Sequence, residues 1–253
     1  MPTPRTTGPH DPAARRRGSP QRAVPPAAGG SLERPPRLLL LDFDRTLADL
    51  GSHVAWERAA SELVAWYERS GIPRGGTGPG AISLYARMAA SNALSPRARE
   101  AAQRGAAAIL TRYERKALAA TRLLPGVGGA LATLARAGLL AGVVSSNSRA
   151  VVHAILERDG VADGFGALVG REDVRRPKPA PEGLLLACRR LGVAPAESMF
   201  AGDNVADMEA ARAAGISAVG VLGGDSSGAA LRGAGARDLT GSVRELVERM
   251  LPP

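Results

Sequence analysis

The segment RLLLLDFDRT carries the clearest chemical signal in the sequence. Four leucines lead directly into Asp42 and Asp44, and Thr46 comes two residues later. Buried strands rarely end in paired negative charge unless a cation or a reacting group offsets it. Taken alone, the two aspartates fit a turn or a helix cap equally well. Their interpretation therefore depends on the residues at the ends of the other apolar runs.

Two further segments offer groups suited to a phosphate. The run VVSSNS places Ser145 and Ser146 before a predicted helix, where hydroxyl and backbone N–H groups can face an anion. In RRPKPAP, Lys178 lies between two prolines, which hold its ammonium group on a stiff, extended segment. Ordinary helix caps and a solvated lysine would explain either segment alone.

Two more carboxylates come after the apolar run in MFAGDNVAD, namely Asp203 and Asp207. In a doubly wound sheet the carboxyl ends of the strands line one crevice, so these two are expected to meet Asp42 and Asp44 there. Four carboxylates would repel each other without a cation. Oxygen ligands with no His or Cys nearby favour Mg²⁺.

The elements that would position these groups alternate along the chain, as expected for a parallel sheet covered on both faces. The apolar runs predict strands over residues 37–42, 139–145, 167–170, 198–202 and 216–222. The 3.6-residue patterns between and after them predict helices over residues 128–136, 149–158, 181–191, 207–214 and 242–250.

The interval from Ala48 to Thr121 is too long for an ordinary crossover between strands. It contains three helical patterns separated by PRGGTGPG and by a Ser-Pro start. We therefore predict a helical domain inserted into the first, with Trp56, Val64 and Trp66 in its core or at its hinge.

The net charge of +9 is concentrated at the N-terminus, since residues 1–37 hold seven arginines and two acidic residues. This Pro-rich and Arg-rich tail lacks a hydrophobic period, so residues 1–36 are expected to be disordered. The remaining charge is spread thinly and aromatic residues make up only 3%, which argues against nucleic-acid binding as the function. With no apolar run long enough for a bilayer, we expect no membrane partner and a cytoplasmic protein. The single cysteine, Cys188, is expected to pack in a helix.

The four groups, in this order, resemble the haloacid dehalogenase-like hydrolase superfamily. Its four motifs match DFDRT, VVSSN, KP and GDNVAD, and the resemblance extends from about residue 37 to 251. Within the superfamily the sequence is most similar to the phosphoglycolate phosphatase and beta-phosphoglucomutase branch. The resemblance implies a doubly wound, Rossmann-like α/β core over residues 37–50 and 122–253, with a helical cap over 51–121.

The resemblance also implies a magnesium-dependent phosphatase acting on a small phosphorylated metabolite. Asp42 would be the nucleophile that forms an aspartyl-phosphate, and Asp44 the general acid and base. The metal ligands would be Asp42, Asp44 through its backbone carbonyl, and Asp203, with Asp207 in the outer shell or orienting Lys178. The predicted phosphate-binding groups are Thr46, Ser145, Ser146 and Lys178. Ser145 and Lys178 are also predicted to be catalytic residues.

Arg45 departs from the family pattern, which usually has glycine at this position. Because arginine does not readily adopt a left-handed backbone, we expect the turn here to avoid positive φ. The side chain would contact either solvent or a substrate anion. In the cap, Arg87, Arg112, Arg115 and Lys116 could bind an acidic substrate or form a solvated face.

Two other functions stay open from the sequence. A phosphosugar mutase of the same fold, similar to beta-phosphoglucomutase, would return the phosphoryl group to a sugar. A non-catalytic regulatory or nucleic-acid-binding module would use the arginine-rich tail, but it would not need the four carboxylates, all of which are present. The oligomeric state, monomer or weak dimer, is not predicted.

Overall fold

The computed structural model describes residues 35–71, 80–90 and 95–251. The helices and strands of these ranges all belong to one compact unit, Ser31–Pro253. The predicted disordered tail, residues 1–36, falls almost entirely outside the described residues.

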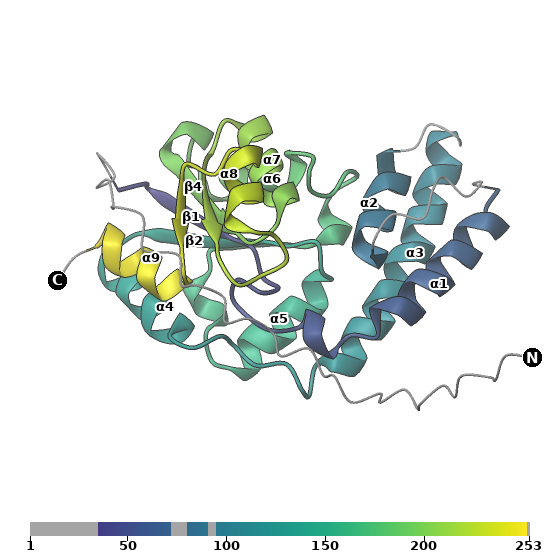
Figure 1. Ribbon diagram of the computed structural model, residues 1–253, viewed down its shortest axis with the longest axis horizontal. Helices are drawn as coiled ribbons and strands as arrows, with labels where there is room; N and C mark the ends of the chain where they lie inside the picture. Colours follow the sequence, from purple (N-terminus) through teal and green to yellow (C-terminus); the bar gives the residue numbers. More distant parts are fainter. Residues whose placement is uncertain (1–34, 72–79, 91–94, 252–253) are drawn as a thin grey trace, which may run out of the picture. The chain divides into compact units, whose positions relative to one another are not determined.

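A six-stranded parallel sheet forms the centre of this unit, in the order β3-β2-β1-β4-β5-β6 (Figure 1). The strands are β1 (Leu38–Leu41), β2 (Leu140–Val144), β3 (Ala167–Val169), β4 (Ser198–Gly202), β5 (Ser217–Val221) and β6 (Asp238–Thr240). The strand order reverses beside β1, which pairs with β2 on one side and β4 on the other. This topology confirms the predicted doubly wound α/β fold, and it places a ligand crevice at the carboxyl end of β1.

Helices cover both faces of the sheet (Figure 1). One face packs against α4 (Val127–Arg136), α5 (Arg149–Arg158) and α9 (Val243–Met250), and the other against α6 (Glu182–Leu191), α7 (Val205–Ala214) and α8 (Gly228–Ala234). Side chains of β1 alternate between the two faces: Leu39 and Leu41 join the first cluster, while Leu38 and Leu40 join the second. This double burial explains why β1 is an unbroken run of leucines rather than an alternating pattern.

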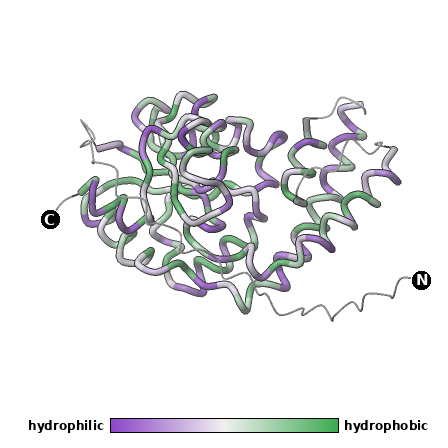
Figure 2. Tube along the Cα trace, in the orientation of Figure 1, coloured by the Kyte–Doolittle hydropathy of each residue, from purple (hydrophilic) through white to green (hydrophobic). Residues whose placement is uncertain are grey.

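The predicted inserted segment is helical where the structure describes it. Its helices α1 (Trp56–Arg69), α2 (Ala81–Ala90) and α3 (Pro96–Ala117) enclose a hydrophobic cluster of their own. Hydrophobic and hydrophilic residues both occur along α1 and α3 (Figure 2). Trp56 packs against both this cluster and the cluster between the sheet and α4, α5 and α9. Trp66 packs in the helical cluster, and Val64 is half-buried.

Strand β6 and helix α8 have no counterpart in the sequence-based prediction. Cys188 is buried on α6, as predicted. Among the described segments, none of the helices has both the length and the apolar character needed for a bilayer span.

Candidate active site

Asp42 continues the line of β1 beyond its last strand residue. Its backbone N–H donates to Ala201 O on β4 at 2.9 Å, which fixes the position of the residue, and its side chain is buried. Asp42 Oδ1 accepts a hydrogen bond from Lys178 Nζ at 2.6 Å. Lys178, buried between Pro177 and Pro179, also donates to Asp207 Oδ1 at 2.5 Å. One ammonium group therefore bridges two of the four predicted carboxylates.

The turn after β4 supplies Asp203 and the first turn of α7 supplies Asp207, and both are buried. Asp207 Oδ2 accepts the Asn204 N–H at 3.0 Å in a capping box at the start of α7, while Asp203 Oδ2 accepts the Asp225 N–H at 2.8 Å. Two glycines permit this close packing. A Cβ on Gly202 would collide with Asp207 Oδ2, and one on Gly224 would collide with Asp203 Oδ2.

Asp42, Asp203 and Asp207 form a group that could hold a metal ion, with ligand oxygens within 4.8 Å of one another. Burial raises the pKa of Asp42 well above its usual value despite the nearby Lys178, and burial with the charge of Asp207 raises the pKa of Asp203 to about 7. Burial alone would lower the pKa of Lys178, but Asp207 and Asp42 raise it overall. The Lys178 ammonium group contacts two of these three carboxylates, so with all three ionised the cluster would carry an excess of negative charge. An all-oxygen donor set with this excess charge fits Mg²⁺.

Asp44 lies apart from that group. Its Oδ1 accepts the Gly51 N–H at 2.7 Å, and burial raises the pKa of its carboxyl group to about 6. An acid with a pKa in this range can be protonated near neutral pH and can exchange a proton with a bound ligand. Thr46 is buried, and its Oγ1 donates a long hydrogen bond to Asp203 Oδ1 at 3.4 Å.

The loop after β2 holds the predicted phosphate-binding hydroxyls. β2 pairs with β1 in parallel, with Leu41 opposite Val143, so Ser145 comes directly after the strand next to the one that carries Asp42. Ser145 is buried, and its Oγ donates to Asn147 Oδ1 at 2.9 Å while accepting the Asn147 N–H at 3.1 Å. Ser146 is half-buried. The sheet therefore places the predicted phosphate-binding loop beside the carboxylate cluster.

A family model described as a haloacid dehalogenase-like hydrolase matches residues 36–215. The chain belongs to the haloacid dehalogenase-like hydrolases.

Phosphoglycolate phosphatases are among its curated relatives. That of Shigella boydii is 37% identical over 119 residues, which are 47% of this chain and 47% of the relative. That of Escherichia coli is 38% identical over 111 residues, 44% of each chain. The chain thus spans about half the length of the curated relatives it matches.

Solved structures extend the similarity over most of the fold. A protein described as a haloacid dehalogenase-like hydrolase from Bacteroides fragilis aligns with a TM-score of 0.60 and 27% identity. The alignment covers 83% of this chain and 99% of that one. The predicted α/β fold is therefore shared with this family member.

In this haloacid dehalogenase-like hydrolase, Arg45 contradicts our expectation about the turn. The expected avoidance of positive φ is wrong, because Arg45 has φ 55. The surrounding turn imposes this conformation through hydrogen bonds from Arg45 N to Ala48 O at 2.7 Å and from Leu47 N to Phe43 O at 2.8 Å. A non-glycine residue tolerates it at a cost of about 1–2 kcal/mol.

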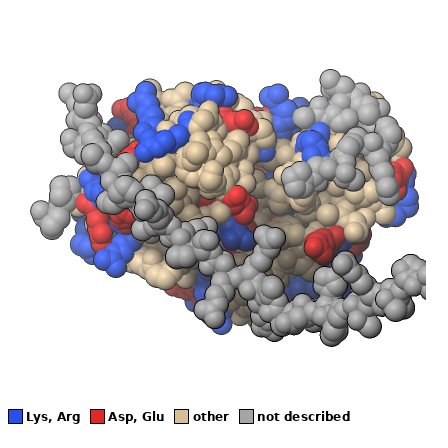
Figure 3. Space-filling model, in the orientation of Figure 1, with Lys and Arg blue, Asp and Glu red and all other residues tan. Residues whose placement is uncertain are grey.

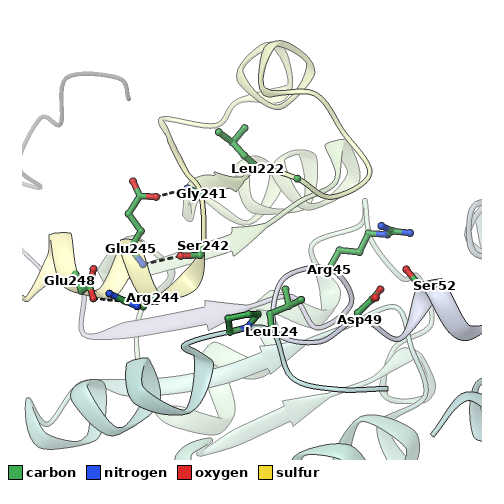
Figure 4. Close-up of a pocket in the computed structure, with 12 residues that line it drawn as sticks. Arg45, Asp49, Ser52, Leu124, Leu222, Gly241, Ser242, Arg244, Glu245 and Glu248 are labelled. Carbon is green, nitrogen blue, oxygen red and sulfur yellow. Dashed lines mark hydrogen bonds and ion pairs between the residues drawn. The ribbon is translucent and has the colours of Figure 1, made fainter. Parts of the chain in front are cut away.

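The Arg45 side chain forms an ion pair with Asp225, at 3.0 Å from Nε to Oδ1. Figure 4 shows it near Asp49 and Ser52 on the wall of a pocket of about 700 Å³. Asp225 also provides the N–H that holds Asp203. Arg45 therefore connects the turn after Asp42 to the loop that supports Asp203, a role that neither expected environment included.

Two charged residues beside the predicted phosphate-binding loop of this hydrolase were not predicted from the sequence. Glu114 on α3 and Arg171 in the short 3-10 helix η3 (Arg171–Asp173) form an ion pair, and both side chains are fully buried. A signal was present, since Glu114 comes after Ala106 and Leu110 at intervals of four residues on the buried stripe of α3. A charge at such a position indicates a buried partner.

Proposed function

We propose that this chain is a magnesium-dependent phosphatase that hydrolyses a small phosphate monoester through an aspartyl-phosphate. The observation that carries the proposal is the grouping of Asp42, Asp203 and Asp207 around Lys178, with Asp44 held separately by Gly51. Family membership and the phosphoglycolate phosphatase relatives support it.

Two aspartates have distinct roles in the proposed chemistry. An Asp42 carboxylate oxygen attacks phosphorus, the bond from phosphorus to the ester oxygen breaks, and Asp44 gives its proton to the departing oxygen. In the second half, Asp44 takes a proton from water as the water oxygen attacks the phosphorus of the aspartyl-phosphate. The bond to Asp42 then breaks, which releases phosphate and restores the carboxylate.

The remaining residues bind and orient the phosphoryl group. Lys178, Ser145 and Ser146 supply donors for its oxygens, with Thr46 beside them. Asp207 orients Lys178, and the 2.5 Å contact between them supports this over a place in the outer shell of a metal. Mg²⁺ would be held by Asp42, the Asp44 backbone carbonyl and Asp203, and would neutralise negative charge during transfer.

We further infer that the predicted division into domains holds, with residues 51–121 as a cap that selects the substrate. The separate hydrophobic cluster of α1–α3 supports it. A cleft of about 1700 Å³, lined by nine basic and four acidic residues, lies between α2 and α3 and the segment 171–176. Arg112, Arg115 and Lys116 are among its lining residues, and Arg112 pairs with Glu62. This positive cleft favours an ester whose leaving group carries further negative charge.

The face in Figure 3 carries Lys and Arg interspersed with Asp and Glu, which favours a small metabolite over a nucleic acid as partner. The alternative that uses the arginine-rich tail concerns residues outside the described ranges. A cytoplasmic location stays a prediction.

Release of inorganic phosphate from a panel of small phosphate esters, with and without Mg²⁺, tests the function. We expect Mg²⁺-dependent release by the wild type and none by Asp42→Asn, which keeps the size of the side chain but not the nucleophile. Undiminished release by Asp42→Asn would contradict the proposal. Conversion of beta-glucose 1-phosphate to glucose 6-phosphate, without release of phosphate, would support the mutase instead.

A further inference from the structure

We propose that Glu114 is a positioning residue that fixes the phosphate-binding loop and makes phosphate binding depend on helix α3. The inference rests on the proposed function, because it concerns how the loop that begins at Ser145 binds the phosphoryl group. Glu114 belongs to the inserted helices, whereas its hydrogen-bond and ion-pair partners among the described residues belong to the segments that come after β2 and β3.

The Glu114 carboxylate uses both oxygens to hold the loop. Oε1 accepts a hydrogen bond from Asn147 Nδ2 at 2.9 Å, and Oε2 accepts the Ser148 N–H at 3.1 Å. Oε2 also forms the ion pair with Arg171 Nη2. The Arg171 backbone N–H in turn donates to Asn147 O at 3.0 Å, so both members of the ion pair hydrogen-bond to the loop.

A contribution to stability alone is a poor explanation for this pair. Removing two charges from water costs about as much as their attraction returns, and an apolar pair of the same volume is often equally stable. The Arg171 guanidinium has the Tyr85 ring 5.9 Å away, and beyond its ion pairs none of its three nitrogens makes a hydrogen bond within the described residues. What an apolar pair could not supply is a carboxylate that accepts hydrogen bonds from the loop.

The effect on phosphate binding passes through the Asn147 amide. A carboxylate only accepts, so Glu114 requires the NH₂ group of Asn147 to face it, which directs Oδ1 toward Ser145. Oδ1 accepts the Ser145 hydroxyl, and the Asn147 backbone N–H donates to the same hydroxyl oxygen. Glu114 therefore fixes the position of Ser145 Oγ, whose single proton turns from Asn147 Oδ1 to a phosphoryl oxygen when phosphate binds. Without the Glu114 carboxylate the side-chain amide of Asn147 can flip by 180°, and Ser145 then loses its fixed position.

Four variants separate positioning from a purely structural role. Glu114→Gln removes the carboxylate but leaves the charge of Arg171 buried, so Glu114→Gln/Arg171→Met is the main test because it restores neutrality at similar volume. Arg171→Lys keeps both the carboxylate and a positive partner for it, whereas a methionine alone at this position would leave the carboxylate buried and unpaired. Glu62→Gln is the matched control: it breaks the ion pair with Arg112, also on α3 but far less buried.

The readouts are the dissociation constant for inorganic phosphate by calorimetry, KM and kcat for an active ester, and the melting temperature. Loss of a charge-assisted hydrogen bond predicts a rise of about tenfold in both the phosphate dissociation constant and KM for the double variant, with kcat changed by less than about threefold. Arg171→Lys, assayed below its melting temperature, and Glu62→Gln should both bind phosphate like the wild type.

Two results would overturn the inference. One is phosphate binding within twofold of wild type in the double variant. The other is an equal loss of binding in Arg171→Lys, which keeps the carboxylate and its countercharge and would show that the pair only maintains the fold. Because calorimetry measures phosphate directly, a wild type that binds phosphate but hydrolyses no ester would count against the proposed function and leave this test intact.

Discussion

At the scale of single residues, Arg45 is the clearest conflict between sequence and backbone. It adopts φ 55, which glycine would adopt without strain, and its side chain pairs with Asp225. The Arg45 side chain is 36% exposed and that of Asp225 is 57% exposed, so solvent screens the ion pair and it adds little stability. Substitutions at position 45 can therefore separate the effect of backbone strain on stability from the effect of the ion pair.

We expect the free energy of unfolding of Arg45→Gly to lie within about 1 kcal/mol of the wild-type value. Relief of backbone strain in the folded state offsets the greater conformational freedom of the unfolded glycine variant. Arg45→Ala loses the same ion pair but keeps a Cβ at positive φ, and should be about 1 kcal/mol less stable than Arg45→Gly. Urea unfolding of the two variants measures this difference. An alanine variant as stable as the glycine variant would show that the turn relaxes away from positive φ.

Asp44 allows a test of proton transfer on its own. Asp44→Asn keeps an oxygen that can accept the Gly51 N–H but cannot give up or take a proton at neutral pH. For an alkyl phosphate, whose leaving oxygen needs a proton, kcat should fall by roughly 10²–10⁴-fold. For p-nitrophenyl phosphate, whose leaving group is stable as an anion, formation of the aspartyl-phosphate should continue.

Rapid-mixing measurements of the nitrophenol burst would show that first step, even if later hydrolysis is slow. Equal loss of the burst and of alkyl phosphate turnover would argue that Asp44 does not act as the acid.

At the scale of elements, the sequence predicted β1 to β5 because each is a continuous apolar run between turn residues, as buried parallel strands require. It missed α8 and β6, which lie within GAALRGAGARDLT. That segment is glycine-rich and short, so no apolar period develops along it. The site was predicted where strand ends carry charge, but Glu114 was missed, because its partners come from segments distant in the sequence.

Helix α3 also supports a prediction about the substrate. Arg115 lines the basic cleft and is exposed, and the described residues provide no ion-pair partner for it. Arg115→Ala should raise KM about 2–10-fold for an ester with a further carboxylate or phosphate, and leave p-nitrophenyl phosphate unaffected. Arg136→Ala on α4, where the arginine is also exposed, is the control. An equal change for both substrates would indicate a general loss of structure rather than recognition of charge.

At the scale of the whole molecule, the balance of charge in the crevice determines how a cation affects stability. Asp42, Asp203 and Asp207 share one buried lysine, and the raised pKa values of Asp42 and Asp203 show that their charged forms are disfavoured without a cation. A cation that binds only the folded chain shifts unfolding by mass action. At 100 times its dissociation constant, Mg²⁺ should add about 2.7 kcal/mol.

For a chain of this size that gain corresponds to a rise of about 5–10 °C in melting temperature, measurable by calorimetry at pH 8.

Asp203→Asn removes one charge from the cluster, so the sign of its effect on the melting temperature should depend on whether Mg²⁺ is present. Without Mg²⁺ the variant should melt at or above the wild-type temperature, because repulsion is relieved. With Mg²⁺ it should melt below wild type, because a ligand is missing. A variant less stable than wild type by the same amount in both conditions would show that Asp203 acts through its hydrogen bond to the Asp225 N–H and not through charge.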